Sequence, residues 1–271
     1  MTPLSPADQL FLWMEKRQQP MHVAGLQLFN FPEDAGPRYI RDLVEHLRTF
    51  SEPQHPFNKR LVRRFGQYFW ETDPQFDLEH HFRHRALPKP GRIRELLSYV
   101  SAAHSNLMDR QRPLWEVHLI EGVQGRRFAL YTKVHHSLFD GISAMRMGSR
   151  ALSTDIDARD LPPIWAMPPR RKPAGLPNPI DVATGAVRMT SGFSKQLATM
   201  PAVVKEMAKV ARKSQRDPNF VPFMNAPASI LNSDITGSRR FAAQSYPMER
   251  FKAIGKVFGC TLNDVVLAVC G

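Results

Sequence analysis

Prolines between Leu161 and Pro179 constrain the fold more than any other feature of the chain. This segment, LPPIWAMPPRRKPAGLPNP, contains seven prolines. Proline lacks a backbone N–H and restricts φ, so it interrupts both helices and central strands. We therefore expect a crossover that lies over a surface. It separates a long N-terminal part of the 271-residue chain from a shorter C-terminal part.

Hydrophobic periodicity in the N-terminal part predicts alternating strands and helices. Ser5 is the expected N-cap of a first helix, with Pro6 as its first residue and Asp8 completing a capping box. We expect strands at 22–31 and 61–72, helices at 38–49, 93–108 and 141–152, and a hairpin formed by 114–122 and 126–136. This order predicts a mixed α/β fold, an α+β sandwich.

The C-terminal part begins with a basic amphipathic pattern at 182–213, which predicts a helix. A strand is expected at 239–247 and a helix at 248–259. A last helix should start at Thr261, with Asp264 as its capping-box partner. This apolar helix reaches the end of the sequence without a C-cap, so we expect more polypeptide beyond it. We divide the chain into domains at 1–160, 161–225 and 226–271.

The net charge of +12 favours polyanionic partners: nucleic acid, anionic lipid or a phosphorylated cofactor such as coenzyme A. Basic residues are spread along the chain without a zinc-finger, RNP-like or basic-zipper pattern, so we expect no nucleic-acid partner. The two cysteines, Cys260 and Cys270, have no CxxC spacing, which fits a reducing compartment. Neither a secretory signal nor an apolar run of about 20 residues is evident, so a soluble or peripheral protein is expected.

The segment KVHHSLFDGIS, residues 133–143, is the sharpest chemical feature of the sequence. The expected strand ends with His135 and His136, and a turn containing Asp140 and Gly141 leads into a helix. Successive strand side chains point to opposite faces, so the two histidines should have different roles. His136 would share a face with alternate strand residues, namely Phe128, Leu130, Thr132 and Val134.

An imidazole at this position could act as a general base. Its ordinary pKa of about 6.5 lets it accept a proton from a hydroxyl and return one to a leaving group. Acyl transfer from a thioester to an alcohol needs that relay and a stabilised oxyanion. Asp140 could orient the loop through an arginine, and Gly141 would allow a sharp turn or a close approach of substrate.

Other interpretations remain open from the residues alone. His135, His136 and Asp140 could be structural strand-end and helix-cap residues. A metal site there is less favoured, because adjacent strand histidines diverge. The cluster EHHFRH at 79–84 could also seat a metal, yet its flanks look extended, which favours packing or surface roles. Ser137 lacks a nucleophile-elbow context, which argues against an acyl-serine intermediate.

HHSLFDG, residues 135–141, resembles the HHxxxDG motif of the chloramphenicol-acetyltransferase-like superfamily. Four more stretches resemble the bacterial wax ester synthase/diacylglycerol acyltransferase family: LSPADQLFLWMEKRQQPMHVAGLQLF (4–29), PGRIRELL (90–97), RPLWEVHLIEG (112–122) and LNDVVLAVC (262–270). The similarity extends over essentially the whole chain and is weakest in the crossover.

The resemblance implies the first of two similar acyltransferase subdomains, with an active-site tunnel between them. It implies that His136 is the general base and that His135 supports it, whereas Asp140 and Gly141 have structural roles. The PLW motif corresponds to Pro113, Leu114 and Trp115, a possible acyl channel, although an aromatic residue on a hairpin is more often core. The ND motif corresponds to Asn263 and Asp264, expected at the subdomain interface.

The resemblance also implies acyl-CoA as co-substrate, no permanently bound cofactor or metal, and a fatty alcohol or diacylglycerol as acceptor. Members of the family continue through a second domain of similar size, so the C-terminal half should follow this chain or dock as a separate chain. A cytoplasmic protein, peripheral at the inner membrane face or on lipid inclusions, is expected. A peptide-synthetase condensation domain and a non-catalytic basic lipid-surface module are the alternatives.

Overall fold

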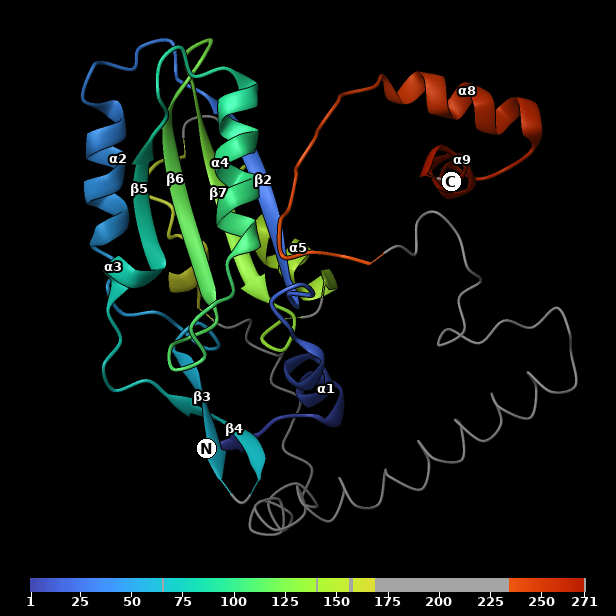
Figure 1. Ribbon diagram of the computed structural model, residues 1–271. Coiled ribbons are helices and arrows are strands. Elements are labelled where there is room, and N and C mark those ends of the chain that lie inside the picture. Colours follow the sequence, from blue (N-terminus) through green and yellow to red (C-terminus); the bar gives the residue numbers. More distant parts are fainter. Residues whose placement is uncertain (65, 140, 156–157, 169–233, 271) are drawn as a thin grey trace, which may run out of the picture. The chain divides into compact units, whose positions relative to one another are not determined.

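The computed structural model describes residues 1–64, 66–139, 141–155, 158–168 and 234–270 (Figure 1). The chain divides into two compact units, Met1–Arg239 and Arg240–Gly271. The basic helix expected at 182–213 and most of the proline-rich crossover lie outside the described residues. Each unit is considered by itself below.

The first unit is built on a four-stranded sheet with the order β2-β7-β6-β5 (Figure 1). Its strands are β2 (His22–Asn30), β5 (Phe82–Ala86), β6 (Trp115–Val123) and β7 (Arg127–His135). β7 is antiparallel to both of its neighbours, whereas β5 is parallel to β6. The expected strand at 22–31 and the expected hairpin are therefore confirmed to within a residue or two.

A second sheet has the order β1-β4-β3, from β1 (Thr2–Pro3), β3 (Lys59–Arg64) and β4 (Gln67–Thr72). The single strand expected over 61–72 is wrong, because these residues belong to two antiparallel strands. Gly66 has φ +77° in the connection between them. Glycine adopts positive φ without a steric penalty, so the chain can reverse there.

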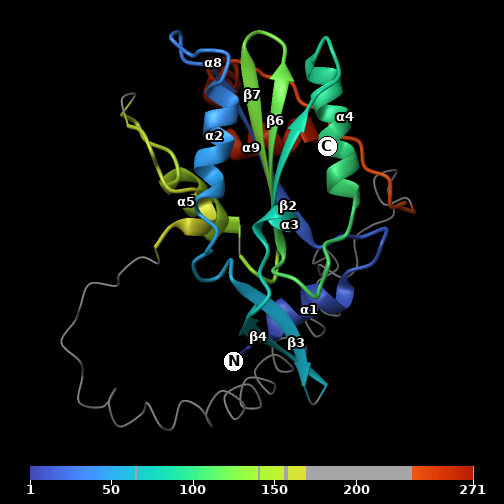
Figure 2. The same ribbon diagram turned by 90° about the vertical axis from the view of Figure 1, so that its left-hand side faces the viewer.

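Helices cover both faces of the main sheet (Figure 2). On one face, α4 (Ile93–Ser105) packs through Leu96 and Val100 against Ala129 and Tyr131. The other face carries the larger core, which is formed with α2 (Tyr39–Arg48), α5 (Gly141–Arg150) and the 3-10 helix η1 (Ile164–Ala166). Helices on the two faces of one mixed sheet confirm the predicted α/β sandwich.

The beginning of the proline-rich segment belongs to the core of the first unit. Trp165 in η1 is 1% exposed, and its indole N–H donates to the carbonyl oxygen of Phe50 at 2.9 Å. The Trp165 ring stacks on Trp115 of β6, with centroids 5.6 Å apart. These contacts anchor the start of the expected crossover on the sheet.

Two short helices precede strands of the main sheet: α1 (Pro6–Met14) comes before β2, and α3 (Leu78–His81) comes before β5. In α1, the Ser5 hydroxyl oxygen accepts the Asp8 N–H at 3.1 Å, which confirms the predicted N-cap. Glu15 follows as the C-cap residue of α1. α3 is a single turn that leads directly into β5.

The second unit contains α8 (Met248–Phe258) and α9 (Leu262–Cys270). The strand expected at 239–247 is wrong: these residues belong to no helix or strand, 240–247 are exposed, and no described strand pairs with them. A strand forms only where a neighbour satisfies its backbone groups. The capping box before α9 is confirmed, since the Asp264 carboxylate accepts the Thr261 N–H at 2.8 Å.

No individual helix in the described part of the chain has the length and apolar composition to cross a bilayer. Taken together, α8 and α9 meet that test of length and composition, with a bend of 102° between them.

Candidate active site

The two adjacent histidines lie at the end of β7 and in the turn that follows it. His135 is the last residue of β7 and is 1% exposed, whereas His136 is half-buried. The backbone N–H of His136 donates to the carbonyl oxygen of Met21 at 2.9 Å. Because β7 ends at His135, the expected strand alternation does not set the direction of the His136 ring.

The imidazole of His136 lies against the ring of Phe11 from α1. The ring centroids are 4.6 Å apart and the planes differ by 15°. Figure 1 places α1 at the end of the main sheet where β7 stops and β2 begins. The stack holds one face of the imidazole, and the half-buried side chain remains accessible to another molecule.

His135 is held by its neighbour two residues ahead. The backbone N–H of Ser137 donates to His135 Nδ1 at 3.1 Å, and the Ser137 hydroxyl lies 2.7 Å from the same nitrogen. A backbone N–H can only donate, so Nδ1 is the acceptor and the ring proton is on Nε2. His135 Nε2 lies 3.3 Å from Glu15 Oε1.

Glu15 is a buried carboxylate whose side chain is 3% exposed. Its Oε1 accepts the Met21 N–H at 3.1 Å, and its Oε2 accepts from Arg110 Nη2 at 2.9 Å. Burial acts to raise the pKa of Glu15, but the contacts with His135, Met21 and Arg110 outweigh it and lower the pKa to about 2. The side chain is therefore a carboxylate at neutral pH.

Neither Glu15 nor Arg110 was among the residues predicted for the site. They are 95 residues apart in the chain and belong to no shared local pattern. Arg110 Nη2 also donates to the carbonyl oxygen of Leu12 at 2.7 Å, which ties it to the last turn of α1. The only available indication was a charged residue directly after the apolar stretch LFLWM that ends α1.

Glu15, His135 and Ser137 have the residue types of an acid–histidine–serine triad, but their geometry argues against a nucleophilic serine. Ser137 is 4% exposed and its backbone N–H already occupies the His135 nitrogen that would act as base. A covalent route needs an exposed hydroxyl beside a free base. This supports the expectation that no acyl-serine forms.

The family motifs contain further residues beside the two histidines. Gly141 is the first residue of α5, directly after the turn. Asp140 lies outside the described residues, so its expected loop-orienting role stays a prediction. In the second unit, Asp264 completes the capping box of Thr261, and Asn263 is exposed in the first turn of α9. Their expected role at a subdomain interface also stays a prediction.

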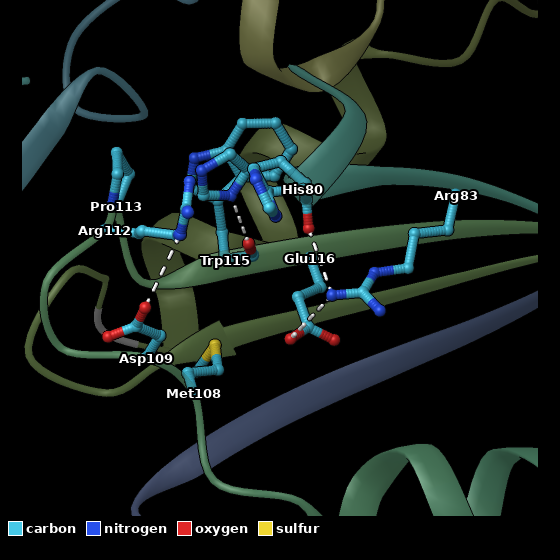
Figure 3. A pocket seen from close by; sticks show the side chains of 9 residues that line it. His80, Arg83, Met108, Asp109, Arg112, Pro113, Trp115 and Glu116 are labelled. Atoms are coloured by element: carbon cyan, nitrogen blue, oxygen red, sulfur yellow. Dashed lines mark hydrogen bonds and ion pairs between the residues drawn. The ribbon is translucent and has the colours of Figure 1, made fainter. Parts of the chain in front are cut away.

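The PLW residues are part of a packed region. Leu114 and Trp115 are 0% and 1% exposed, and the Trp115 indole N–H donates to the Phe57 carbonyl oxygen at 2.8 Å. Pro113 and Trp115 also border a cavity of about 290 Å³ (Figure 3). The remaining lining residues are His80, His81, Arg83, Met108, Asp109, Arg112 and Glu116.

Charged pairs surround this cavity. Arg112 Nε lies 3.4 Å from Asp109 Oδ2, and Arg83 Nη2 lies 3.9 Å from Glu116 Oε1 (Figure 3). An acyl chain favours an apolar channel, so this lining does not itself resemble one. The acyl-channel role of Pro113, Leu114 and Trp115 stays a prediction.

The histidines of the 79–84 cluster have separate partners. His81 is buried, with Nδ1 2.8 Å from the Trp115 carbonyl oxygen, and burial lowers its pKa. His80 lies 3.4 Å from Asp77, and His84 lies 3.1 Å from Glu121. This arrangement is that of packing and surface residues. Within the described residues, no group of three or more His, Cys, Asp or Glu side chains could hold a metal ion.

A second buried charge cluster lies under α4. Lys133 of β7 is 0% exposed, and its ammonium donates to the carbonyl oxygens of Ala103 and Asn106 at 3.0 and 3.1 Å. Lys133 Nζ also lies 3.4 Å from Glu116 Oε2. Burial acts to raise the pKa of Glu116, but His118 and Lys133 lower it to about 2. The cluster fastens the C-terminal end of α4 to the sheet.

Comparisons with known proteins extend over nearly the whole chain. The family model described as the wax ester synthase/diacylglycerol acyltransferase catalytic domain matches residues 4–266. The O-acyltransferase WSD of Acinetobacter baylyi is 47% identical over 273 residues, which cover 100% of this chain and 58% of that protein. A probable diacylglycerol O-acyltransferase of Mycobacterium tuberculosis is 39% identical over 98% of this chain and 58% of its own length.

A solved structure agrees with these matches. The wax ester synthase/diacylglycerol acyltransferase from Marinobacter aquaeolei VT8 superposes with a TM-score of 0.76 at 52% identity. The superposition covers 99% of this chain and 59% of that one. The chain thus spans less than two thirds of the length of the relatives that it matches.

Proposed function

The chain belongs to the wax ester synthase/diacylglycerol acyltransferase family, and on that premise we propose that it carries the general base of an acyl-CoA:alcohol O-acyltransferase. The acyl group moves from acyl-CoA to a long-chain alcohol or a diacylglycerol. His136 is the base. The observation that carries this assignment is the contrast between the two histidines: His135 is buried, with Nδ1 accepting a hydrogen bond and Nε2 3.3 Å from the Glu15 carboxylate, whereas His136 is half-buried.

In the proposed reaction, a ring nitrogen of His136 takes the proton of the acceptor hydroxyl as its oxygen attacks the thioester carbonyl carbon. The tetrahedral intermediate then collapses, the C–S bond breaks, and the imidazolium returns the proton to the departing thiolate. The products are an ester and coenzyme A. Phe11 supports this role, because a stacked ring limits the orientations of the imidazole.

The substrate-binding regions are proposed from the family. Residues 1–160 form the first subdomain, 161–225 the crossover, and 226–271 the beginning of a second subdomain that supplies much of the tunnel. Relatives longer than this chain support the need for that second half, either continuous or as a docked chain. Acyl-CoA acts as co-substrate, without a permanently bound cofactor.

A peripheral location in the cytoplasm, at a membrane or lipid-inclusion surface, completes the proposal. The net charge of +12 supports attraction to anionic lipid, and the expected products are neutral lipids. Family membership favours this activity over that of a peptide-synthetase condensation domain. A basic module that only coats lipid is the remaining alternative.

The test uses the complete polypeptide that contains this chain, incubated with radiolabelled acyl-CoA and either hexadecanol or diacylglycerol. Wild-type protein should form labelled ester, and His136→Ala should remove all but a few per cent of it while the circular dichroism spectrum is unchanged. His46→Ala, a change of a half-buried histidine on α2, is the matched control and should keep full activity. Substantial ester formation by His136→Ala would overturn the assignment. Vesicle binding without thioester turnover in any preparation would favour the lipid-coating alternative.

A further inference from the structure

The end of α1 contacts both histidines of the motif. Phe11 stacks on His136, and Glu15, four residues later, lies against His135. Residues four apart lie on the same side of a helix, so one short element can reach two adjacent side chains. The motif itself contains neither residue.

We propose that Glu15 is a positioning residue for the histidine pair: its carboxylate, held by Arg110, orients His135 and the turn that presents His136. This inference rests on the proposed role of His136. Glu15 does not reach the ring of the base and takes no part in proton transfer. It acts through the groups that hold that base.

Two connections lead from Glu15 to His136. The first passes through His135, whose Nε2 lies 3.3 Å from Glu15 Oε1 and which is covalently next to His136. The second passes through Met21, whose N–H donates to Glu15 Oε1 at 3.1 Å while its carbonyl oxygen accepts the His136 N–H at 2.9 Å. A shift of this carboxylate would therefore move both the backbone and the neighbour of the base.

The site specifically requires a carboxylate. Three groups lie against the Glu15 carboxylate: the Met21 N–H and the Arg110 guanidinium donate to it, and the protonated Nε2 of His135 lies 3.3 Å from Oε1. Two carboxylate oxygens can accept from all three, whereas an amide has one oxygen and places N–H groups against donors. Glu15→Gln keeps the size of the side chain and removes this match.

Arg110 completes the arrangement. Its guanidinium contacts Glu15 Oε2 at 2.9 Å through Nη2 and at 3.3 Å through Nε, and binds the Leu12 carbonyl oxygen. A planar guanidinium that binds both the Glu15 carboxylate and the last turn of α1 fixes the distance between them. Arg110→Gln should therefore weaken positioning in the same direction as Glu15→Gln, but less.

The first test measures steady-state kinetics of ester formation by the complete polypeptide. Glu15→Gln should lower kcat by about tenfold to a hundredfold, as expected for a misplaced catalytic group, while KM for acyl-CoA and alcohol changes little. Arg110→Gln should lower kcat less, and the double variant should lose less than the product of the two single losses. The matched control is Glu121→Gln, which removes the carboxylate of another glutamate–histidine pair and should keep kcat.

The second test does not depend on activity. Nitrogen-15 NMR of histidine-labelled protein reports which ring nitrogen carries the proton. Wild-type His135 should show an acceptor Nδ1, and Glu15→Gln should shift the ring signals of both His135 and His136, whereas Glu121→Gln should leave them in place.

These outcomes separate the two proposals. If wild-type protein makes no ester, the proposed function fails, and the NMR shifts alone decide the positioning role. If Glu15→Gln does not fold, Arg110→Gln takes its place in both measurements. Unchanged kcat in a folded Glu15→Gln protein, or ring signals of both histidines identical to wild type, would overturn the inference.

Discussion

The ring of Phe11 lies nearly parallel to the imidazole of His136, with planes 15° apart and centroids separated by 4.6 Å. Phe11→Ala removes the surface against which the proposed base is oriented. An aromatic pair contributes about 0.5–1.5 kcal/mol, so a loss of roughly twofold to tenfold in kcat is expected. Phe11→Tyr keeps the ring and should keep kcat. Equal kcat for the alanine variant and wild type in the ester assay would contradict this role.

Ser137 provides a test of the reaction route. Ser137→Ala removes the hydroxyl beside His135 Nδ1 but keeps the backbone N–H that also donates to this nitrogen. We expect ester formation within about tenfold of wild type, because a single lost hydrogen bond contributes about 1 kcal/mol. Mass spectrometry after incubation with acyl-CoA should detect no acylated Ser137 peptide in the wild-type protein. Loss of all activity together with such a peptide would restore the covalent route.

The pH dependence of stability should reveal two glutamates with lowered pKa values, the enclosed Glu15 and the half-buried Glu116. The pKa values of Glu15 and Glu116 are about 2 in the folded protein, compared with an ordinary value of 4.5. The folded state therefore binds fewer protons than the unfolded state in this range. The stabilisation is present above about pH 4.5 and is lost as the pH falls towards 2.

Glu116→Gln provides the measurement. The variant should be less stable than wild type at pH 7, because the buried Lys133 ammonium then lacks its carboxylate partner. Its free energy of unfolding, from urea titrations at a series of pH values, should fall less steeply than that of wild type between pH 5 and 2. Identical slopes for the two proteins would show that this carboxylate does not carry the acid sensitivity.

Gly91 should tolerate no side chain. A Cβ at this position would lie 1.7 Å from the carbonyl oxygen of Gly122, and the residue has φ +70°. Gly91→Ala must therefore displace backbone, and we expect a loss of several kcal/mol in the free energy of unfolding, measured by thermal or urea unfolding. Gly148→Ala in α5 is the control: the space is open there, and alanine favours the helix, so stability should stay equal or rise. A Gly91→Ala protein as stable as wild type would contradict the close approach.

Local patterns predicted most elements of the first unit. Residue spacing and capping depend on neighbours in the chain. They predicted the Ser5 cap, the helices observed at 39–48 and 93–105, and the hairpin before His135. The short elements β1, α3 and β5 were not predicted, and the two expectations that were wrong have one cause. Residues 61–72 and 239–247 both have strand-like composition, but only partner strands determine where a strand ends or whether it forms.

The motif identified the two histidines, and spacing implied that they differ. Spacing did not indicate which groups hold them, because Glu15 and Arg110 come from positions 95 residues apart. Lys133 is a second example. Periodicity placed this residue on a strand but did not indicate that its ammonium donates to the carbonyl oxygens of Ala103 and Asn106 at the end of α4. Buried charges are stable only with partners, and those partners come from distant segments.

The amino-acid sequence by itself determined the longer helices and the hairpin of the first unit, the family and the pair of candidate catalytic histidines, because these follow from local periodicity and from contiguous motifs. Only the tertiary structure decided that His135 is enclosed by Glu15 and Ser137 while His136 rests against Phe11. The physical reason is that the orientation of a side chain depends on the charges and surfaces that folding brings next to it, and a linear pattern does not contain those distances.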